Sequence, residues 1–264
     1  MWNPSQYLQY ADHRHRPFVD LVARVDLDAP RRIVDLGCGP GNSTRLLADR
    51  WPDAALDALD SSAEMVSAAR RNGLAAEQGD VRDWTPAEDT DLVVSNALLQ
   101  WVPEHRELLA AWARALPRGA VIAVQMPGNF GAPSHRALRE VAGSAPWVDR
   151  LPVGLLRHDD AVDDPSDYAT LLAAHGCAVD AWETTYVHRL SGTDPVLDWM
   201  RGTALTPVFD ALDDDGQRAF EAELAARLRE AYPAGPDGVT LFPFRRVFCV
   251  ATVGAASGAT DLAG

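Results

Sequence analysis

A short apolar segment that contains an acid and continues into a glycine-rich turn constrains this chain more than any other feature. It is Ile33–Thr44, with the sequence IVDLGCGPGNST. An apolar strand followed by glycines that open a helix is typical of a parallel α/β sheet with a nucleoside ligand at its carboxyl edge. Gly37, Gly39 and Gly41 are spaced two apart. Asn42 stands where the third glycine of a dinucleotide-binding turn would fall, so the spacing favours a ligand without a pyrophosphate.

Strand-like and helix-like segments alternate along the first half of the chain, with short connections between them. We expect strands at residues 32–36, 55–59, 74–77, 91–95 and 120–125, and helices at 17–25 and after the first two strands. Pro17 is expected at the first position of its helix, where a missing N–H costs nothing. This alternation predicts an α/β fold built on a doubly wound, mostly parallel sheet.

The alternation breaks after Pro127. We expect helices near 135–142 and 166–175 and across 194–231, and strands near 179–190 and 246–253. Long insertions at the carboxyl edge of such a sheet are usually functional. We therefore interpret the chain as a single domain, 1–264, with an N-terminal helical cap (1–30), a cofactor-binding half (31–127) and helical lid insertions (128–165 and 194–238). A plain structural elaboration is the open alternative to a lid.

Polar side chains stand where the expected parallel strands end. Asp35 precedes the glycine turn, Asp60 follows the second strand, Asp80 the third and Asn96 the fourth. A carboxylate at the position of Asp60 can accept two hydrogen bonds from ribose hydroxyls. Two simpler interpretations stay open: Asp60 could cap the following helix, although the capping box expected at residues 61–64 already provides a cap, and Asp80 could be a turn residue.

Composition limits the partners. The chain has 24 Lys+Arg against 38 Asp+Glu, a net charge of −14, which argues against binding nucleic acid or an anionic membrane. An acidic substrate would need arginines gathered locally, and the run His13–Arg16 is the densest basic segment. The three cysteines show no metal-ligand spacing, and no apolar run approaches a membrane span. We expect a cytoplasmic protein without a metal.

The segments 34–41 (VDLGCGPG), 59–65 (LDSSAEM) and 79–81 (GDV) resemble the cofactor motifs of class I S-adenosylmethionine-dependent methyltransferases. Segments across nearly the whole chain resemble the branch of that superfamily that methylates trans-aconitate. They are WNPSQYL at 2–8, HRHRP at 13–17, SNALLQWVPEH at 95–105, VQMP at 124–127, WMRGT at 199–203 and FPFRR at 242–246. The resemblance implies a Rossmann-like fold, S-adenosylmethionine as cofactor and a small polycarboxylate as methyl acceptor.

The same resemblance implies roles for individual residues. Gly37 and Gly39 would pass under the methionine part of the cofactor, and Asp35 would lie near its amino group. Asp60 would hold the ribose, Asp80 with Val81 the adenine, and Asn96 would lie near the sulfonium. The full expected cofactor-binding set is Asp35, Gly37, Cys38, Gly39, Asp60, Ser61, Asp80, Val81 and Asn96.

A carboxylate acceptor is ionised at neutral pH, so we expect no general base and no catalytic side chain beyond those that position the reactants. The carboxylates that do not react need a cationic clamp, for which the planar arginine fork is suited. The expected substrate-binding set is Tyr7, Arg14, Arg16, Trp101, Gln125, Arg201 and Arg245. Arg14 could instead hold the carboxylate of the cofactor, each arginine could be a surface charge, and core packing is the favoured simpler interpretation of Trp101.

Other functions stay open at this point. The same fold could methylate another small metabolite, in which case an apolar pocket would replace the arginines. A cofactor-binding protein without activity is a second alternative, because this chemistry has no obligatory base. A nicotinamide-dependent dehydrogenase is disfavoured by the glycine spacing.

Overall fold

The computed structural model describes the backbone of residues 11–254 and the side chains from residue 15 onward. These residues form two compact units. The sheet unit contains His15–Met126, Asp163–Glu183 and residues 247–254, and the helical unit contains Pro127–Val162 and Thr184–Arg246. No helix among the described residues is both long enough and apolar enough to cross a membrane.

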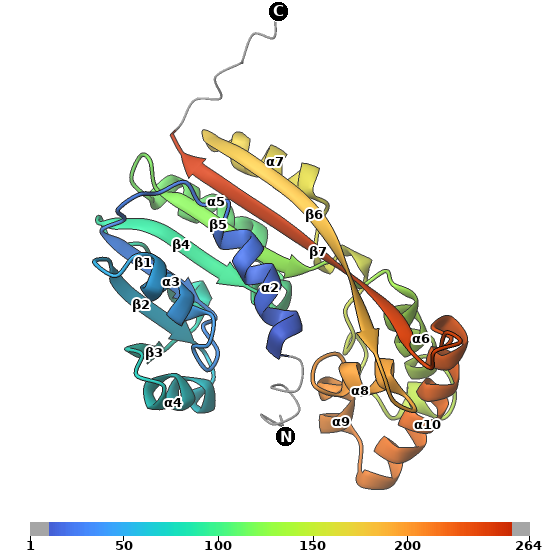
Figure 1. Cartoon of the computed structure of the whole chain (residues 1–264). Helices are drawn as coiled ribbons and strands as arrows, with labels where there is room; N and C mark the ends of the chain where they lie inside the picture. The colour runs from blue at the N-terminus through green and yellow to red at the C-terminus, as the bar shows by residue number, and fades with distance from the viewer. Residues whose placement is uncertain (1–10, 255–264) are drawn as a thin grey trace, which may run out of the picture. The chain divides into compact units, whose positions relative to one another are not determined.

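A seven-stranded sheet with the order β3-β2-β1-β4-β5-β7-β6 forms the centre of the sheet unit (Figure 1). Its strands are β1 (Arg32–Leu36), β2 (Ala55–Asp60), β3 (Ala76–Gln78), β4 (Thr90–Asn96), β5 (Val121–Pro127), β6 (Cys177–Leu190) and β7 (Thr240–Val253). The first five strands pair in parallel, and β7 runs opposite to its neighbours in Figure 1. The structure therefore confirms the mostly parallel sheet and the order that β1 to β5 follow in a doubly wound fold.

The central strands are apolar because helices cover a parallel sheet on both faces. Ile33, Leu92 and Ile122, on three adjacent strands, are fully buried. The helices of this unit are α2 (Ala11–Val22), α3 (Thr44–Arg50), α4 (Ala63–Arg71), α5 (His105–Ala115) and α7 (Pro165–Ala173). Two short 3₁₀ helices, Val81–Asp83 (η1) and Leu99–Trp101 (η2), follow β3 and β4.

The helical unit has its own apolar core. It contains α6 (Pro133–Ala142), α8 (Pro195–Arg201), α9 (Thr206–Ala211), α10 (Asp214–Ala231), the 3₁₀ helices Trp147–Asp149 (η3) and Asp159–Ala161 (η4), and parts of β6 and β7. One face of α10 buries Phe220, Leu224 and Leu228, the residues that the helical spacing predicts. They pack in one cluster with Trp147 and Phe242.

The segment expected to be helical, 194–231, contains three helices, α8 to α10. The chain turns after Arg201 and again at Leu212, where Asp213 caps α10 by accepting from Gly216 N–H at 2.8 Å. Two expected boundaries are wrong. The last strand begins at Thr240 rather than at 246. Pro17 lies inside α2 instead of at its first turn, at the cost of one backbone hydrogen bond.

Candidate functional site

The sheet register brings three of the expected polar side chains to one face. Asp35 is opposite Ala58 on β2 and Val94 on β4. Because side chains alternate along a strand, Asp60 and Asn96, each two residues farther on, point to the same face as Asp35. Gln125 is paired with Asn96 across β4 and β5 and shares that face. The carboxyl ends of β1, β2, β4 and β5 thus present polar groups to one face, and on the first three of these strands they are the residues that the sequence predicts.

The glycine turn after β1 needs glycine for two reasons. Gly37, Gly39 and Gly41 have φ angles of +80°, +55° and +86°, which residues with a Cβ atom rarely adopt. A Cβ atom at Gly37 would also lie 2.8 Å from that of Leu98, whereas a Cβ atom at Gly39 would meet nothing within 4 Å. The turn therefore keeps the end of β1 close to the segment after β4.

Asp60 connects this turn to the next helix. One carboxylate oxygen accepts the Gly39 N–H at 2.9 Å, and the other accepts the Ser62 N–H at 2.9 Å. Ser62 caps α4 by accepting from Met65 N–H, so the cap lies one residue later than the predicted Ser61. Each Asp60 oxygen can still accept another hydrogen bond, because a carboxylate oxygen has two lone pairs. The carboxylate is therefore held in place by two backbone N–H groups.

Asp35 is buried behind the turn. Its side chain is 2% exposed and accepts a hydrogen bond from the Thr44 hydroxyl at 2.7 Å. Burial raises the pKa of Asp35 to about 6; the Thr44 hydrogen bond opposes that shift and the nearby charge of Asp60 adds to it. Burial likewise raises the pKa of the Cys38 thiol to about 12, so this cysteine is an inert thiol at neutral pH.

Asp80 is held by an arginine that the sequence analysis missed. Asp80 caps the 3₁₀ helix η1 by accepting the Arg82 N–H at 2.9 Å, and the same oxygen accepts from Arg82 Nε at 2.9 Å. The second oxygen accepts from Arg82 Nη2 at 2.5 Å. These hydrogen bonds lower the pKa of Asp80 to about 2. The only signal in the sequence was the spacing of Asp80 and Arg82 two residues apart after a strand.

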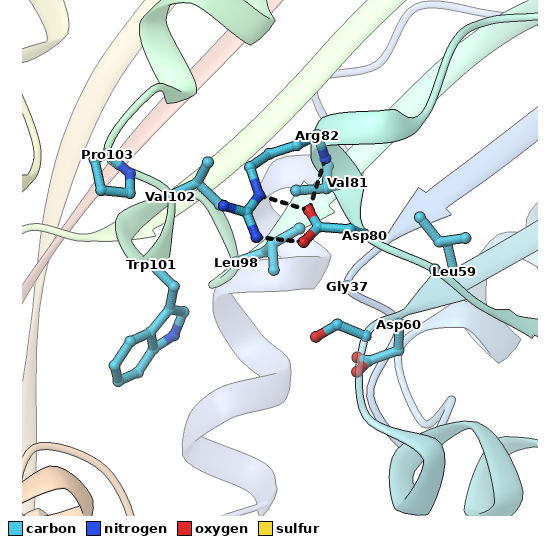
Figure 2. Close-up of a pocket in the computed structure, with 12 residues that line it drawn as sticks. Gly37, Leu59, Asp60, Asp80, Val81, Arg82, Leu98, Trp101, Val102 and Pro103 are labelled. Atoms are coloured by element: carbon cyan, nitrogen blue, oxygen red, sulfur yellow. Dashed lines mark hydrogen bonds and ion pairs between the residues drawn. The ribbon is translucent and has the colours of Figure 1, made fainter.

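A pocket of about 180 Å³ lies at the carboxyl edge beside Asp60 and Asp80 (Figure 2). Its lining includes the predicted Gly37, Asp60, Ser61, Asp80, Val81 and Trp101. Six further lining residues were not predicted: Leu59, Gly79, Arg82, Leu98, Val102 and Pro103. The pocket thus combines carboxylate acceptors with apolar walls, which suits a ligand with hydroxyl and amine donors on a flat apolar ring.

Trp101 corrects one expectation. Core packing was the favoured simpler interpretation, but the side chain is 46% exposed and lines the pocket. The reason lies in the backbone: Ala97 adopts a φ of +57°, and the chain then turns through the 3₁₀ helix η2. Gln100, inside that helix, is buried and donates from Nε2 to the Ala97 carbonyl at 2.7 Å, and Trp101 faces outward.

Asn96 carries an unsatisfied acceptor at the same edge. Its Oδ1 is buried and has no hydrogen-bond partner, as is true of the Ser95 Oγ beside it. Buried polar atoms are seldom left without a partner in folded proteins. Together with Asp60 and Asp80, this end of β4 offers acceptors for a ligand that brings donors. Gln125, on β5, is fully buried.

The expected arginines are distributed between the units. Tyr7 and the side chain of Arg14 lie outside the described residues. Arg16 belongs to the sheet unit, and its side chain is 73% exposed, 3.9 Å from Asp20. Arg201 and Arg245 belong to the helical unit. Arg201 donates to Glu221 at 2.5 Å and also to Asp198, and these carboxylates raise its pKa.

Arg245 has a different environment. It is half-buried, and its Nη1 donates to the Gly128 carbonyl at 3.1 Å. The Gly128 N–H in turn donates to the Arg245 carbonyl at 3.0 Å. Gly128 follows the last residue of β5, so these two hydrogen bonds hold Arg245 beside the segment that leaves the carboxyl end of that strand.

Comparison with known proteins defines the class first. A family model described as a methyltransferase domain matches residues 33–119, the segment that carries the glycine turn and the strand-end acids. The YcgJ protein of Bacillus subtilis superimposes with a TM-score of 0.59 at 13% identity, covering 90% of this chain and 98% of that one. A Haemonchus contortus phosphoethanolamine N-methyltransferase 2, solved with S-adenosyl-L-methionine, gives 0.51 at 13% identity, covering 90% and 52%. At such identities the likeness concerns the fold, a Rossmann-like α/β methyltransferase fold.

Sequence relatives define the family. A trans-aconitate 2-methyltransferase of Rhodococcus jostii (strain RHA1) is 63% identical over 253 residues, which cover 96% of this chain and 100% of that protein. A trans-aconitate 2-methyltransferase of Mycobacterium tuberculosis (strain ATCC 25177 / H37Ra) is 54% identical over 256 residues, which cover 97% of this chain and 98% of that protein. The chain belongs to the trans-aconitate 2-methyltransferase family.

Proposed function

We propose that this protein is an S-adenosylmethionine-dependent O-methyltransferase that forms the monomethyl ester of a small polycarboxylate, trans-aconitate. The observation that carries the proposal is the 63% identity over the whole length of a relative with that name. The pocket at the carboxyl edge, lined by Asp60, Asp80 and apolar side chains, supports a nucleoside cofactor independently of the relatives.

We propose that Asp60 accepts from the ribose hydroxyls and Asp80 from the adenine amino group. The two lone pairs that Asp60 keeps free support its role. The unsatisfied Oδ1 of Asn96 supports a ligand that brings a donor or a positive charge to the end of β4. The other proposed cofactor-binding residues are Asp35, Gly37, Cys38, Gly39, Ser61 and Val81.

When bound, S-adenosylmethionine supplies an electrophilic methyl group on a sulfonium. A carboxylate acceptor is already ionised at neutral pH, so the chain has no proton to remove. The work left to the protein is to hold the acceptor oxygen in line with the methyl group and to exclude water. Trp101 is suited to the second task, because its indole borders the pocket and is 46% exposed.

We propose that arginines pair with the carboxylates that do not react. A chain of net charge −14 repels a polyanionic substrate, so positively charged side chains must gather at the substrate site. Arg245 is the favoured candidate because it is anchored beside the segment that leaves the end of β5. Arg201 is less suited, because Glu221 and Asp198 already balance its charge. Tyr7, Arg14, Arg16 and Gln125 complete the proposed set.

We also propose that the protein acts on small molecules in the cytoplasm, without a nucleic acid or a membrane as partner. The net charge of −14 supports this, because polyanions and anionic membranes are repelled. The cysteines Cys38, Cys177 and Cys249 are all free and buried, as is usual in a reducing compartment.

The test is a product assay. The purified protein is incubated with methyl-labelled S-adenosylmethionine and, separately, trans-aconitate, cis-aconitate, citrate and a monocarboxylate, and the products are identified by mass spectrometry. We expect a singly methylated trans-aconitate ester as the main product. If a different acid is methylated, trans-aconitate is not the acceptor and the protein acts on another metabolite. If the cofactor binds but no product forms, the protein is a non-catalytic binding protein.

A further inference from the structure

We infer that Arg82 is a positioning residue for the cofactor, which fixes the Asp80 carboxylate so that a single acceptor position faces the adenine amino group. The inference rests on the proposed function, because it assumes that a nucleoside with an adenine occupies the pocket. It assigns a task to a residue that the sequence analysis did not select and that lines the pocket beside Asp80.

The hydrogen bonds of Asp80 support this by counting. A carboxylate offers about four lone-pair positions, two on each oxygen. Arg82 fills both on Oδ1, with its backbone N–H at 2.9 Å and its Nε at 2.9 Å, and one on Oδ2, with its Nη2 at 2.5 Å. One position remains, on Oδ2. A bound amine can therefore donate to Asp80 without breaking the ion pair.

The orientation follows from the same contacts. Nε and Nη2 are two donors on the same edge of the planar guanidinium, so they hold the carboxylate in the guanidinium plane. Figure 2 shows the guanidinium between Asp80 and the side of the pocket formed by Val102. The charges of Glu104 and Asp83 also act on Arg82 in the direction that keeps it protonated. A carboxylate without this fork would rotate and hydrate freely, since the side chain of Asp80 is one-third exposed.

The geometry defines which ring substituent is preferred. The remaining position on Asp80 is an acceptor, so it favours an exocyclic amine over a carbonyl oxygen at the same place on the purine. Arg82 makes this preference sharper by limiting Asp80 to one direction. A purely structural arginine, which only stabilises η1, would leave the preference unchanged.

The experiment measures two affinities by calorimetry: that for S-adenosylhomocysteine and that for its analogue with a carbonyl in place of the adenine amino group. In Arg82→Gln we expect the affinity for S-adenosylhomocysteine to fall about tenfold, the size of one charged hydrogen bond. The affinity for the analogue should change much less, so that the preference for the amine falls several-fold. Arg82→Lys keeps the charge but loses the fork, and we expect an intermediate value.

A double-mutant cycle with Asp80→Asn separates positioning from a general effect. In the Asp80→Asn background, Arg82→Gln should cause little further loss, because its partner is gone. The matched control is Arg218→Gln, which removes an exposed arginine of the helical unit that pairs with Asp215 three residues earlier, and should leave both affinities unchanged.

If Arg82→Gln lowers the affinities for the two ligands by the same factor, the preference for the amine is unchanged. That result would overturn the inference while leaving the proposed function intact. A wild-type protein that binds neither S-adenosylhomocysteine nor S-adenosylmethionine would instead overturn the proposed function, and this inference with it. Because Arg82 is 59% exposed, we expect its variants to fold, and thermal unfolding checks that they do.

Discussion

Asp60 in the sheet unit and Arg201 in the helical unit are held in opposite ways. At the carboxyl edge of the sheet, Asp60 is held by two backbone N–H groups, which position it without cancelling its charge. In the helical unit, Arg201 is held by two carboxylates, which cancel its charge as they position it. A charge that backbone groups position is still available to a ligand, whereas a charge that opposite charges position is mainly structural.

This contrast separates candidate ligand-binding residues from structural ones more clearly than residue type does. Asp80 is intermediate, because a single arginine holds it and one acceptor position remains. Arg245 resembles Asp60 in that a hydrogen bond to a backbone group, the Gly128 carbonyl, helps to hold it. The first and third of the four predictions below test this distinction.

The largest expected effect concerns Arg245 and Arg201. Arg245→Ala should reduce kcat/KM for trans-aconitate about 100-fold, roughly 3 kcal/mol, because the acceptor carboxylate that we propose it pairs with would lose its partner. Arg201→Ala is the matched control and should lower stability with little change in acceptor kinetics. Steady-state kinetics with purified variants measure both. Equal kinetic losses in the two variants would remove the distinction drawn here.

The second prediction concerns pH and Asp35. Its carboxyl pKa is about 6 in the folded protein, above the ordinary value near 4 expected for the unfolded chain. The folded state therefore binds this proton more tightly, and the contribution of Asp35 to stability falls as pH rises from about 4 to about 6. Two pKa units correspond to at most roughly 3 kcal/mol.

Asp35→Asn should remove that part of the pH dependence, because an amide does not titrate and can still accept from the Thr44 hydroxyl. The measurement is urea unfolding of both proteins between pH 4 and pH 7. We expect the variant to gain stability relative to wild type as pH rises through this window. If the two proteins show the same dependence on pH, Asp35 is not the buried carboxyl that opposes folding.

The third prediction concerns Asp60. Asp60→Ala should weaken binding of S-adenosylmethionine by about 2 kcal/mol, because the ribose hydroxyls that we propose it binds would lose a charged acceptor. Asp57→Ala is the control: it removes the same charge from the same strand, but Asp57 pairs with Arg32 and does not line the pocket. Calorimetric titration compares them. Similar losses in both variants would indicate that net charge, rather than the position of Asp60, determines affinity.

The sequence predicted the central strands well because β1, β4 and β5 are buried along nearly their whole length. The predicted 32–36 is the observed β1, β2 is one residue longer than predicted at its carboxyl end, and β4 is one residue longer at each end. It located the helix ends in the helical unit less well, although Gly202 at the C-cap of α8 and Pro207 in the first turn of α9 are local signals for the first break.

The pocket residues also divide into those that a local sequence signal predicts and those that it does not. Gly37, Asp60 and Asp80 were predictable, because strand ends and glycine turns leave a local signal. The exposure of Trp101 was not, because it follows from the left-handed backbone of Ala97, a residue with no preference for that conformation. The fork of Arg82 required the 3₁₀ turn that brings it back onto Asp80. The roles of all these residues toward ligands stay predictions.

The smallest expected effect concerns Gly37 and Gly39, in the glycine turn after β1. Gly37 and Gly39 both have positive φ, so replacement by alanine should cost about 1–2 kcal/mol of unfolding free energy at either position. Only at Gly37 does the new Cβ atom meet the Cβ of Leu98, at 2.8 Å, and that atom is too close to the backbone to move aside. Gly37→Ala should therefore cost about 1–2 kcal/mol more than Gly39→Ala, in the range expected for overpacking.

Urea unfolding without ligand measures this difference, and each variant serves as the control for the other. Gly39→Ala retains the N–H that donates to Asp60, so its loss should be conformational alone. A difference close to zero would show that Leu98 gives way at little cost. The contact between the glycine turn and the segment after β4 would then be loose, and the carboxyl edge would owe its order to the hydrogen bonds of Asp60 rather than to packing.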